Sequence, residues 1–251
     1  MALAMARMAV ADGTTILACT PHIFPGVYNN TGPQILAAID QLRIALAAEN
    51  IPLHLVQGGD VHIAPDLVAK LSSGEALSLN GSRYVLVEPP HHILPPRVED
   101  LFFDLLSTGY VPILTHPERM GWIEREFELV EKLFDSGVWM QLTAGAITGN
   151  FGRRAQRWSE KMLEMGMVHI VASDGHDPEH RPPVLGEARK VLVDLVGEEE
   201  AHNLLFVRPN GILYNKDVFE MPPVASMAVA ADDTAQSPSI WGHISGWFRE
   251  R

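Results

Sequence analysis

The sequence predicts an α/β fold in which a mostly parallel sheet curls into a barrel, and three observations support this prediction. Between residue 14 and about residue 200, β-rich runs alternate with helical stretches, a pattern typical of parallel strands joined by helices. Polar side chains follow the carboxyl ends of these runs, where the loops of a parallel barrel converge on one face. The length of 251 residues suits one domain of this kind.

The elements are expected in a regular order. A helix opens the chain, because Met1, Met5 and Met8 recur at helical spacing and Gly13 follows as a stop. The β-rich runs that come after it cover residues 15–20, 53–58, 84–88, 110–115, 138–143 and 168–173. The helices between these runs are expected at residues 33–50, 98–109, 126–137 and 156–166.

Composition and charge exclude several classes of protein. Hydrophobic residues make up 47% and charged residues 20%, which is typical of a globular chain. A net charge of −12 argues against a nucleic-acid partner, which needs a basic face. A single cysteine forms no internal disulfide, and the apolar start "MALAMA" is interrupted by Arg7 before it resembles a signal peptide. We therefore expect a cytoplasmic protein.

The chain divides into three parts by composition. Residues 1–220 form the predicted barrel, and residues 221–239 are rich in Pro, Ala, Ser and Asp, as in a linker. In residues 240–251, an apolar face above two arginines predicts a short amphipathic helix that contacts a membrane surface or a partner. Two glycines in so short a segment favour a disordered tail, and both interpretations remain open.

The carboxyl ends of successive strands carry imidazoles and carboxylates. Such a mixed donor set suits Mn²⁺, Fe or Zn²⁺ rather than Ca²⁺ or a thiolate site. It is too large for one tetrahedral ion, and bridging carboxylates would hold two or three ions ~3.5–4 Å apart for phosphate-ester hydrolysis. A single histidine at a strand end is more often structural, but six such side chains predict a metal centre. The candidate ligands are His22, Asp60, Glu88, His116, Asp174 and His176.

Two arginines follow these ligands closely. Arg119 comes three residues after His116, and Arg181 comes seven residues after Asp174. Both are predicted to bind a phosphate group through paired hydrogen bonds, with a surface salt bridge as the alternative.

Other histidines are placed outside the predicted site. His91 and His92 stand in a proline-rich loop, where surface histidines are common, and His62 is a weak ligand candidate because it follows a candidate carboxylate by two residues. His54 and His169 lie near strand starts, at the opposite end of the barrel, and are predicted to be structural.

Rival chemistries lack their motifs. Cysteine-dependent tyrosine phosphatases need an arginine six residues after the cysteine, and here Pro25 follows Cys19 at that distance. The chain also contains neither a P-loop nor the Gly-x-Ser-x-Gly elbow of hydrolases. We therefore interpret Cys19 as a small buried strand residue.

The ordered set "TPH … GGDVH … VEPP … THPER … QLTAG … ASDGH … RPP" resembles the polymerase-and-histidinol-phosphatase superfamily. More narrowly, it resembles the manganese-dependent tyrosine phosphatases of bacterial capsule and exopolysaccharide loci, the CpsB/CapC/YwqE type. The resemblance runs from Met1 to about residue 215.

The resemblance implies a distorted seven-stranded parallel β/α barrel that binds up to three metal ions, Mn²⁺ by preference. It implies phosphate contacts for Arg119 and Arg181, and it implies ligand roles for His22, Glu88, His116, Asp174 and His176. The implied substrate is phosphotyrosine on the Tyr-rich tail of a membrane-associated bacterial tyrosine kinase that controls polysaccharide synthesis.

Two departures from the family pattern stand out. The position of Asp60 is more often Glu, and the shorter Asp would change the geometry between ions. The family also begins with a strand carrying His-x-His, which would be the barrel's first strand and is missing here. We hypothesise that Met1 is an internal methionine of a protein about twenty residues longer. A chain that starts at Met1 is expected to bind metal weakly at one site and to have little phosphatase activity.

Three functions therefore remain open. We favour a metal-dependent phosphotyrosine phosphatase. A small-molecule phosphoesterase of the same superfamily, such as one acting on histidinol phosphate, is the first alternative. The second is a catalytically impaired regulator that binds a phosphorylated peptide through its arginines.

Overall fold

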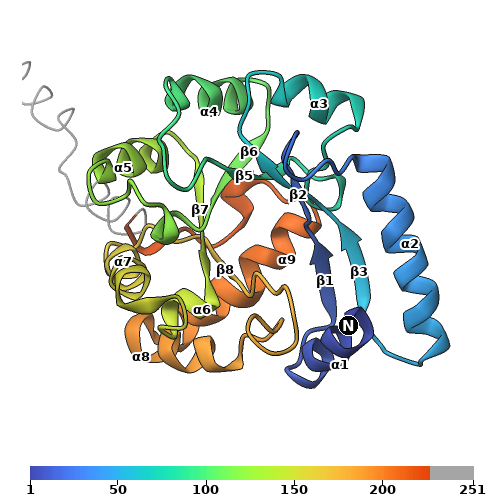
Figure 1. Cartoon of the computed structure of the whole chain (residues 1–251). Helices are drawn as coiled ribbons and strands as arrows, with labels where there is room; N and C mark the ends of the chain where they lie inside the picture. The colour runs from blue at the N-terminus through green and yellow to red at the C-terminus, as the bar shows by residue number, and fades with distance from the viewer. Residues whose placement is uncertain (227–251) are drawn as a thin grey trace, which may run out of the picture.

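Parallel strands curled into a half-barrel form the centre of the molecule, as the computed structural model of the chain shows for residues 1–226 (Figure 1). Six strands run side by side in the order β2-β4-β5-β6-β7-β8, and β1 pairs with β3. The strands are β1 (Ile16–Cys19), β2 (His22–Ile23), β3 (His54–Gln57), β4 (Asp60–His62), β5 (Tyr84–Glu88), β6 (Val111–Thr115), β7 (Trp139–Thr143) and β8 (Ile170–Ala172). The α/β class and the parallel sheet are confirmed.

Each predicted β-rich run contains a strand, but the first two runs continue further than expected. After a break at Thr20 and Pro21, β1 is followed by β2, and β3 is followed by β4 in the same way. Pro21 has no N–H to give to a ladder, which explains the first break. At the second break, a Cβ on Gly59 would lie only 2.7 Å from Ile23 Cδ1, so the chains approach closely there. The two short strands place His22 directly opposite Asp60.

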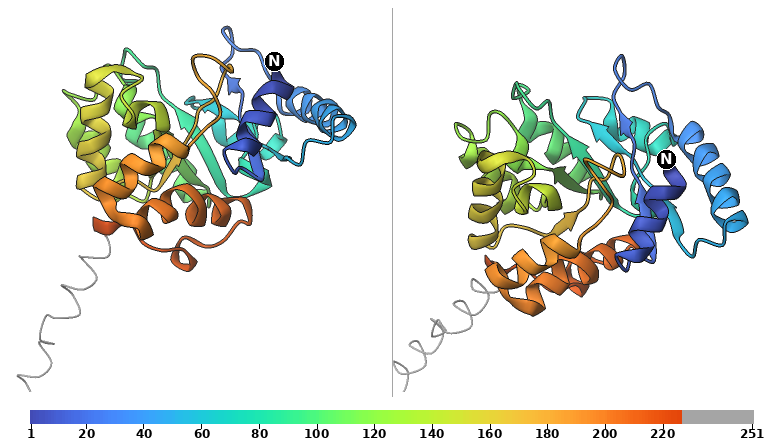
Figure 2. Two further views of the ribbon diagram at one scale, coloured as in Figure 1. Left: turned by 90° about the horizontal axis from the view of Figure 1, so that it is seen from below. Right: turned by 60° about the horizontal axis from the view of Figure 1, so that its bottom comes forward.

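Helices cover the outside of the sheet (Figure 1). The α-helices are α1 (Ala2–Ala11), α2 (Gly32–Ala48), α3 (Leu67–Ser73), α4 (Val98–Ser107), α5 (Phe127–Asp135), α6 (Ala144–Ile147), α7 (Gly152–Glu164), α8 (Gly186–His202) and α9 (Arg208–Leu213). Short 3-10 turns cover Leu79–Gly81, Pro117–Arg119 and Val218–Glu220, and a π-turn covers Asn203–Val207. In two further views, α8 and α9 (orange) lie between α7 (yellow) and α1 (dark blue) (Figure 2).

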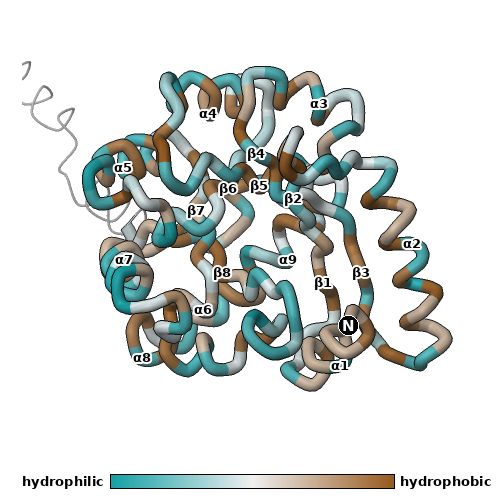
Figure 3. The backbone as a smooth tube through the Cα atoms, in the orientation of Figure 1, coloured by the Kyte–Doolittle hydropathy of each residue, from teal (hydrophilic) through white to brown (hydrophobic). Residues whose placement is uncertain are grey.

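The core lies between the sheet and these helices. All five residues of β5 and all five of β7 are buried, as expected for parallel strands covered on both faces. Apolar segments follow the strands, and polar segments gather on the loops and outer helices (Figure 3). Among residues 1–226, no helix combines the length and the apolar character needed to cross a bilayer.

The first helix is present where the sequence predicts it. It spans Ala2–Ala11 and ends before Gly13, whose φ of +96° suits glycine. The buried positions are Ala6 and Ala9, whereas Met5 and Met8 are half-buried. Small alanines on this face allow the close approach of α1 to the core.

The folded part extends beyond residue 220. Met221 and Val224 are buried, and the carbonyls of Pro222 and Pro223 accept hydrogen bonds from the buried Arg208 guanidinium at 2.9 and 2.8 Å. Residues 221–226, expected to begin a linker, therefore pack against the domain. The rest of that expected linker and the predicted helix at 240–251 lie outside the described residues.

Candidate metal centre

Three neighbouring strands bring predicted ligands together at one edge of the half-barrel. His22 opens β2, Asp60 opens β4, and Glu88 ends β5. His22 Nδ1 lies 3.4 Å from Asp60 Oδ2 and 3.2 Å from Glu88 Oε2. The parallel register aligns neighbouring strands, so three of the predicted ligands form one group of donor atoms.

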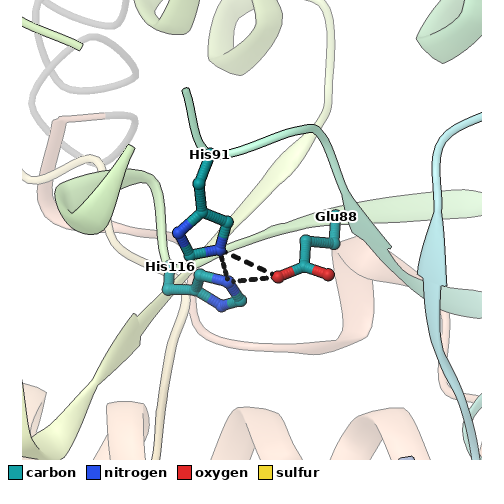
Figure 4. A group of neighbouring side chains, drawn as sticks. All are labelled: Glu88, His91 and His116. Carbon is teal, nitrogen blue, oxygen red and sulfur yellow. Dashed lines mark hydrogen bonds and ion pairs between the residues drawn. The ribbon is translucent and has the colours of Figure 1, made fainter. Parts of the chain in front are cut away.

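A second group shares Glu88 and contains two histidines. His116 Nε2 lies 2.9 Å from Glu88 Oε1, and His91 Nε2 lies at the same distance from that oxygen. The two imidazoles face this carboxylate from different loops (Figure 4). His91, which was expected to lie outside the site, therefore contacts two of the predicted ligands. His91 lies three residues after the end of β5, whereas most of the predicted ligands stand at or next to the ends of the β-rich runs.

The backbone is unusual at two candidate ligands. His116 and Asp174 have positive φ values of +38° and +49°, which non-glycine residues rarely adopt. His116 directly follows β6, and Asp174 lies two residues after the end of β8. Such conformations cost of order 1–3 kcal/mol each and cluster at functional sites, where the fold holds them in place.

The pKa values of the Asp60 and Glu88 carboxyls are shifted in opposite directions. Burial, and then the charge of Glu88, raises the pKa of Asp60 to about 8. Burial alone would also raise the pKa of Glu88, but the imidazoles of His116, His22 and His91 outweigh it and hold that pKa well below its usual value. Without another cation, Asp60 therefore keeps a proton while Glu88 is ionised.

The two arginines converge on one carboxylate. Arg119 Nη1 donates to Asp174 Oδ2 at 2.6 Å, and Arg181 Nη2 donates to the same oxygen. The Phe151 ring centroid lies 4.4 Å from Arg119 Cζ and 5.4 Å from Arg181 Cζ, so the ring contacts both cations. Both predicted phosphate-binding arginines therefore lie together beside a predicted ligand.

His176 lies at the rim of the site. Its ring centroid is 6.1 Å from that of His22, and its Nδ1 is 2.9 Å from the carbonyl oxygen of Asp174. It is more exposed than the other five predicted ligands. The structure thus places all six predicted ligands along one edge, with Asp174 and His176 outside the two tight donor groups.

A buried glutamate links the turn after β6 to the end of β7. Glu118 is fully buried, and its Oε1 accepts a hydrogen bond from Thr143 N at 2.9 Å. Burial raises the pKa of Glu118 to about 7. This contact fixes the turn that carries His116 and Arg119 to the end of β7. This role of Glu118 was not predicted from the sequence, although its place between two predicted site residues in "HPER" was a signal.

The remaining histidines near the site have other roles. His62 stacks on Phe24 with ring centroids 3.7 Å apart and belongs to neither donor group. The His92 ring centroid is 6.4 Å from that of His91, and His92 is exposed.

At the opposite end of the strands, His54 is exposed and His169 is buried. The ring of His169 stacks on Trp139 at 4.6 Å, and its Nδ1 accepts a hydrogen bond from Met140 N at 3.0 Å. The structural role predicted for His169 is confirmed. Cys19 is half-buried on β1, and burial raises the pKa of its thiol.

A cavity of about 270 Å³ adjoins the arginine pair. Its lining includes Arg181, Phe151, Pro182 and Thr148. An apolar wall beside a guanidinium suits a ligand that has an aromatic or aliphatic part and an anionic part.

The donor groups fit divalent metal ions. His22 Nδ1 is buried and faces two carboxylate oxygens, yet among residues 1–226 it makes no hydrogen bond of acceptable geometry. A cation between these atoms would satisfy the nitrogen lone pair and both carboxylates. Imidazole and carboxylate ligands together suit Mn²⁺, Fe²⁺ or Zn²⁺.

Comparisons with known proteins agree with this geometry. A family model described as "Capsular polysaccharide synthesis, CpsB/CapC" matches residues 1–214. The tyrosine-protein phosphatase YwqE of Bacillus subtilis is 36% identical over 219 residues, which are 87% of this chain and 86% of that protein. The tyrosine-protein phosphatase CpsB of Streptococcus agalactiae is 25% identical over 218 residues, 85% of this chain and 90% of that protein.

One solved structure shares the fold. It comes from work on YwqE from Bacillus subtilis and CpsB from Streptococcus pneumoniae, described as unique metal-dependent tyrosine phosphatases. It superposes with a TM-score of 0.82 at 35% identity, covering 88% of this chain and 90% of the other. The half-barrel fold is therefore shared with a protein described as a metal-dependent tyrosine phosphatase.

Proposed function

The chain belongs to the CpsB/CapC family of capsular polysaccharide synthesis, and from this premise we propose that it is a metal-dependent phosphatase that hydrolyses phosphotyrosine on a protein. The names of its relatives, tyrosine-protein phosphatases at 36% and 25% identity, support this reaction class. So does the fold shared with a metal-dependent tyrosine phosphatase.

The observation that carries the proposal is the meeting of two guanidinium groups beside the donor cluster. Arg119 and Arg181 share one oxygen of Asp174, which occupies the kind of position that a phosphate oxygen would take. Two arginines on one anion suit a dianionic phosphate better than a single carboxylate. The nearby donor groups would hold the ions that such a phosphate needs.

Each residue has a distinct part in this proposal. Bound metal ions would supply an activated hydroxide and neutralise charge on the phosphate. Arg119 and Arg181 hold the non-bridging oxygens, and Phe151 keeps both guanidinium planes in place. His22, Asp60, Glu88, His116, Asp174 and His176 are the proposed metal ligands, with Mn²⁺ as the preferred ion, Fe or Zn²⁺ as alternatives, and up to three ions bound.

The proposed substrate is a phosphotyrosine in the Tyr-rich tail of a membrane-associated bacterial tyrosine kinase, met in the cytoplasm. The cavity beside Arg181 suits an aromatic ring attached to a phosphate, because Phe151 and Pro182 line it. The net charge of −12 opposes a nucleic-acid substrate. Docking of residues 240–251 to a membrane or partner stays a prediction.

Substrate comparison tests the proposal. Chelator-treated protein reloaded with Mn²⁺ is assayed for phosphate release from a phosphotyrosine peptide and from histidinol phosphate. We expect kcat/KM to be higher for the peptide by about 10²-fold, the discrimination typical of a site that binds part of one substrate only. Equal or reversed values would favour the small-molecule phosphoesterase. Tight peptide binding without turnover would favour the impaired regulator.

Arginine variants add a control to the same assay. Arg119→Ala and Arg181→Ala are expected to lower kcat/KM for the peptide by about 10²–10³-fold, the typical loss of one preorganised donor to a developing charge. Arg7→Ala is the matched control, because Arg7 pairs with Glu49 on the surface, away from the site. Unchanged turnover in both site variants would contradict the proposed phosphate contacts.

A further inference from the structure

The loop after β5 brings an imidazole to the donor cluster from an unexpected direction. The predicted ligands lie at strand ends, whereas His91 lies in the sequence "VEPPHHILPPR", past two prolines. His91 Nε2 nevertheless reaches both Glu88 Oε1 and His116 Nε2. Its neighbour His92 does not belong to a donor group.

The position of His91 is fixed by the surrounding fold. Gly121 N donates to the carbonyl of His91 at 2.7 Å, and the indole of Trp122 donates to the carbonyl of Pro90 at 2.9 Å. A Cβ on Gly121 would lie 3.0 Å from that same His91 oxygen, so a glycine allows this close approach. Pro89 and Pro90 restrict the backbone before it. These contacts hold the imidazole over the cluster.

The three donor atoms form a nearly equilateral triangle. Glu88 Oε1 is 2.9 Å from each histidine Nε2, and the two nitrogens are 3.0 Å apart. If both Nε2 atoms carried hydrogens, the two N–H groups would point at the same Glu88 oxygen, and their hydrogens would repel each other. A cation on one side of the triangle, in contact with all three atoms, replaces this repulsion with three attractive contacts.

The size of the triangle indicates a coordination geometry. Neighbouring ligands at 90° with metal–ligand bonds of about 2.1 Å lie about 3.0 Å apart, whereas tetrahedral ligands at that bond length lie about 3.4 Å apart. The observed separations match the first value. Two histidines and one carboxylate on one face of an octahedron form a known arrangement for divalent transition metals.

We propose that His91 is a metal ligand, and that Glu88, His91 and His116 bind one octahedral ion such as Mn²⁺. Glu88 joins this site to the other donor group, because its Oε1 faces the triangle and its Oε2 faces His22. The inference rests on the metal dependence in the proposed function, but not on the identity of the substrate.

Metal binding tests this role directly. The full chain is freed of metal with a chelator, and Mn²⁺ binding is measured by electron paramagnetic resonance of the free ion and by calorimetry. His91→Ala is expected to lose one equivalent of bound Mn²⁺ or to weaken it by about 10-fold or more. The matched control His92→Ala, one residue away in the same loop, is expected to bind as the wild type does.

A second variant protects the test against misfolding. His91→Gln keeps most of the side-chain volume but lacks the imidazole, and it should show the same loss together with a wild-type circular dichroism spectrum. Wild-type stoichiometry and affinity in a folded His91 variant would overturn the inference, as would a wild-type protein that binds no Mn²⁺. Normal, His91-dependent binding without phosphatase activity would instead refute the proposed function and leave this inference standing.

Discussion

Residues far from the site show how strongly burial controls ionisation in this fold. His169 is only 4% exposed, between Trp139 and Phe134, and its Nδ1 accepts a backbone hydrogen bond. Burial, and then the charge of Arg208, lowers its pKa to about 3. The position of His169 near a strand start was enough to predict a structural role. The packing that lowers its pKa comes from segments distant in the chain and could not be predicted.

This shift makes the protein sensitive to acid. Between pH 6.5 and 3 the unfolded chain protonates His169 while the folded chain does not, so this contribution to stability is complete above pH 6.5 and is lost as the pH falls. When the pH falls from about 7.5 to about 5, protonation of His169 in the unfolded chain should lower the free energy of unfolding by about 2 kcal/mol.

Urea unfolding of the metal-free protein at both pH values measures this cost. His169→Gln should reduce the pH dependence by about that amount. The exposed His54→Gln should leave it unchanged. An identical pH dependence in His169→Gln and the wild type would contradict the assignment.

At the scale of elements, the sequence predicted the strands well and their continuations poorly. Runs of β-branched and apolar residues located β5, β6 and β7 within a residue or two. The short strands β2 and β4 follow a proline or two glycines, which normally end a strand, and only tertiary pairing forms them. His91 was missed for a related reason, since hydrogen bonds from Gly121 and Trp122 position its loop.

A contact between the first helix and α8 gives a test at this scale. The Asp12 carboxylate accepts hydrogen bonds from Leu185 N at 2.5 Å and Gly186 N at 3.2 Å, at the start of α8. It therefore caps a helix 173 residues away in sequence. Asp12→Ala should lower the unfolding free energy by about 1 kcal/mol, and Asp12→Asn by less, because Asn is also a good cap.

Chemical denaturation at constant pH measures these differences, with the exposed Asp40→Ala as a control in α2. Equal stability of Asp12→Ala and the wild type would show that the cap contributes nothing.

At the scale of the whole molecule, topology explains why the site was largely predictable. In residues 1–226 the paired strands run parallel, so the loops that follow them meet on one edge. The six predicted ligands and two arginines come from the strand breaks, strand ends and loops at that edge. Sequence order alone therefore predicted that these side chains lie near one another. It could not give the division into two donor groups joined by Glu88, which depends on side-chain directions and on the loop that carries His91.

The claim that these side chains form a metal centre is tested most directly by anomalous X-ray diffraction. Crystals of Mn²⁺-loaded protein, measured on both sides of the manganese absorption edge, should show one peak among Glu88, His91 and His116 and another between His22, Asp60 and Glu88. Each peak should lie about 2.0–2.3 Å from its donor atoms. Fully ordered side chains with no anomalous peak at either group would contradict the account.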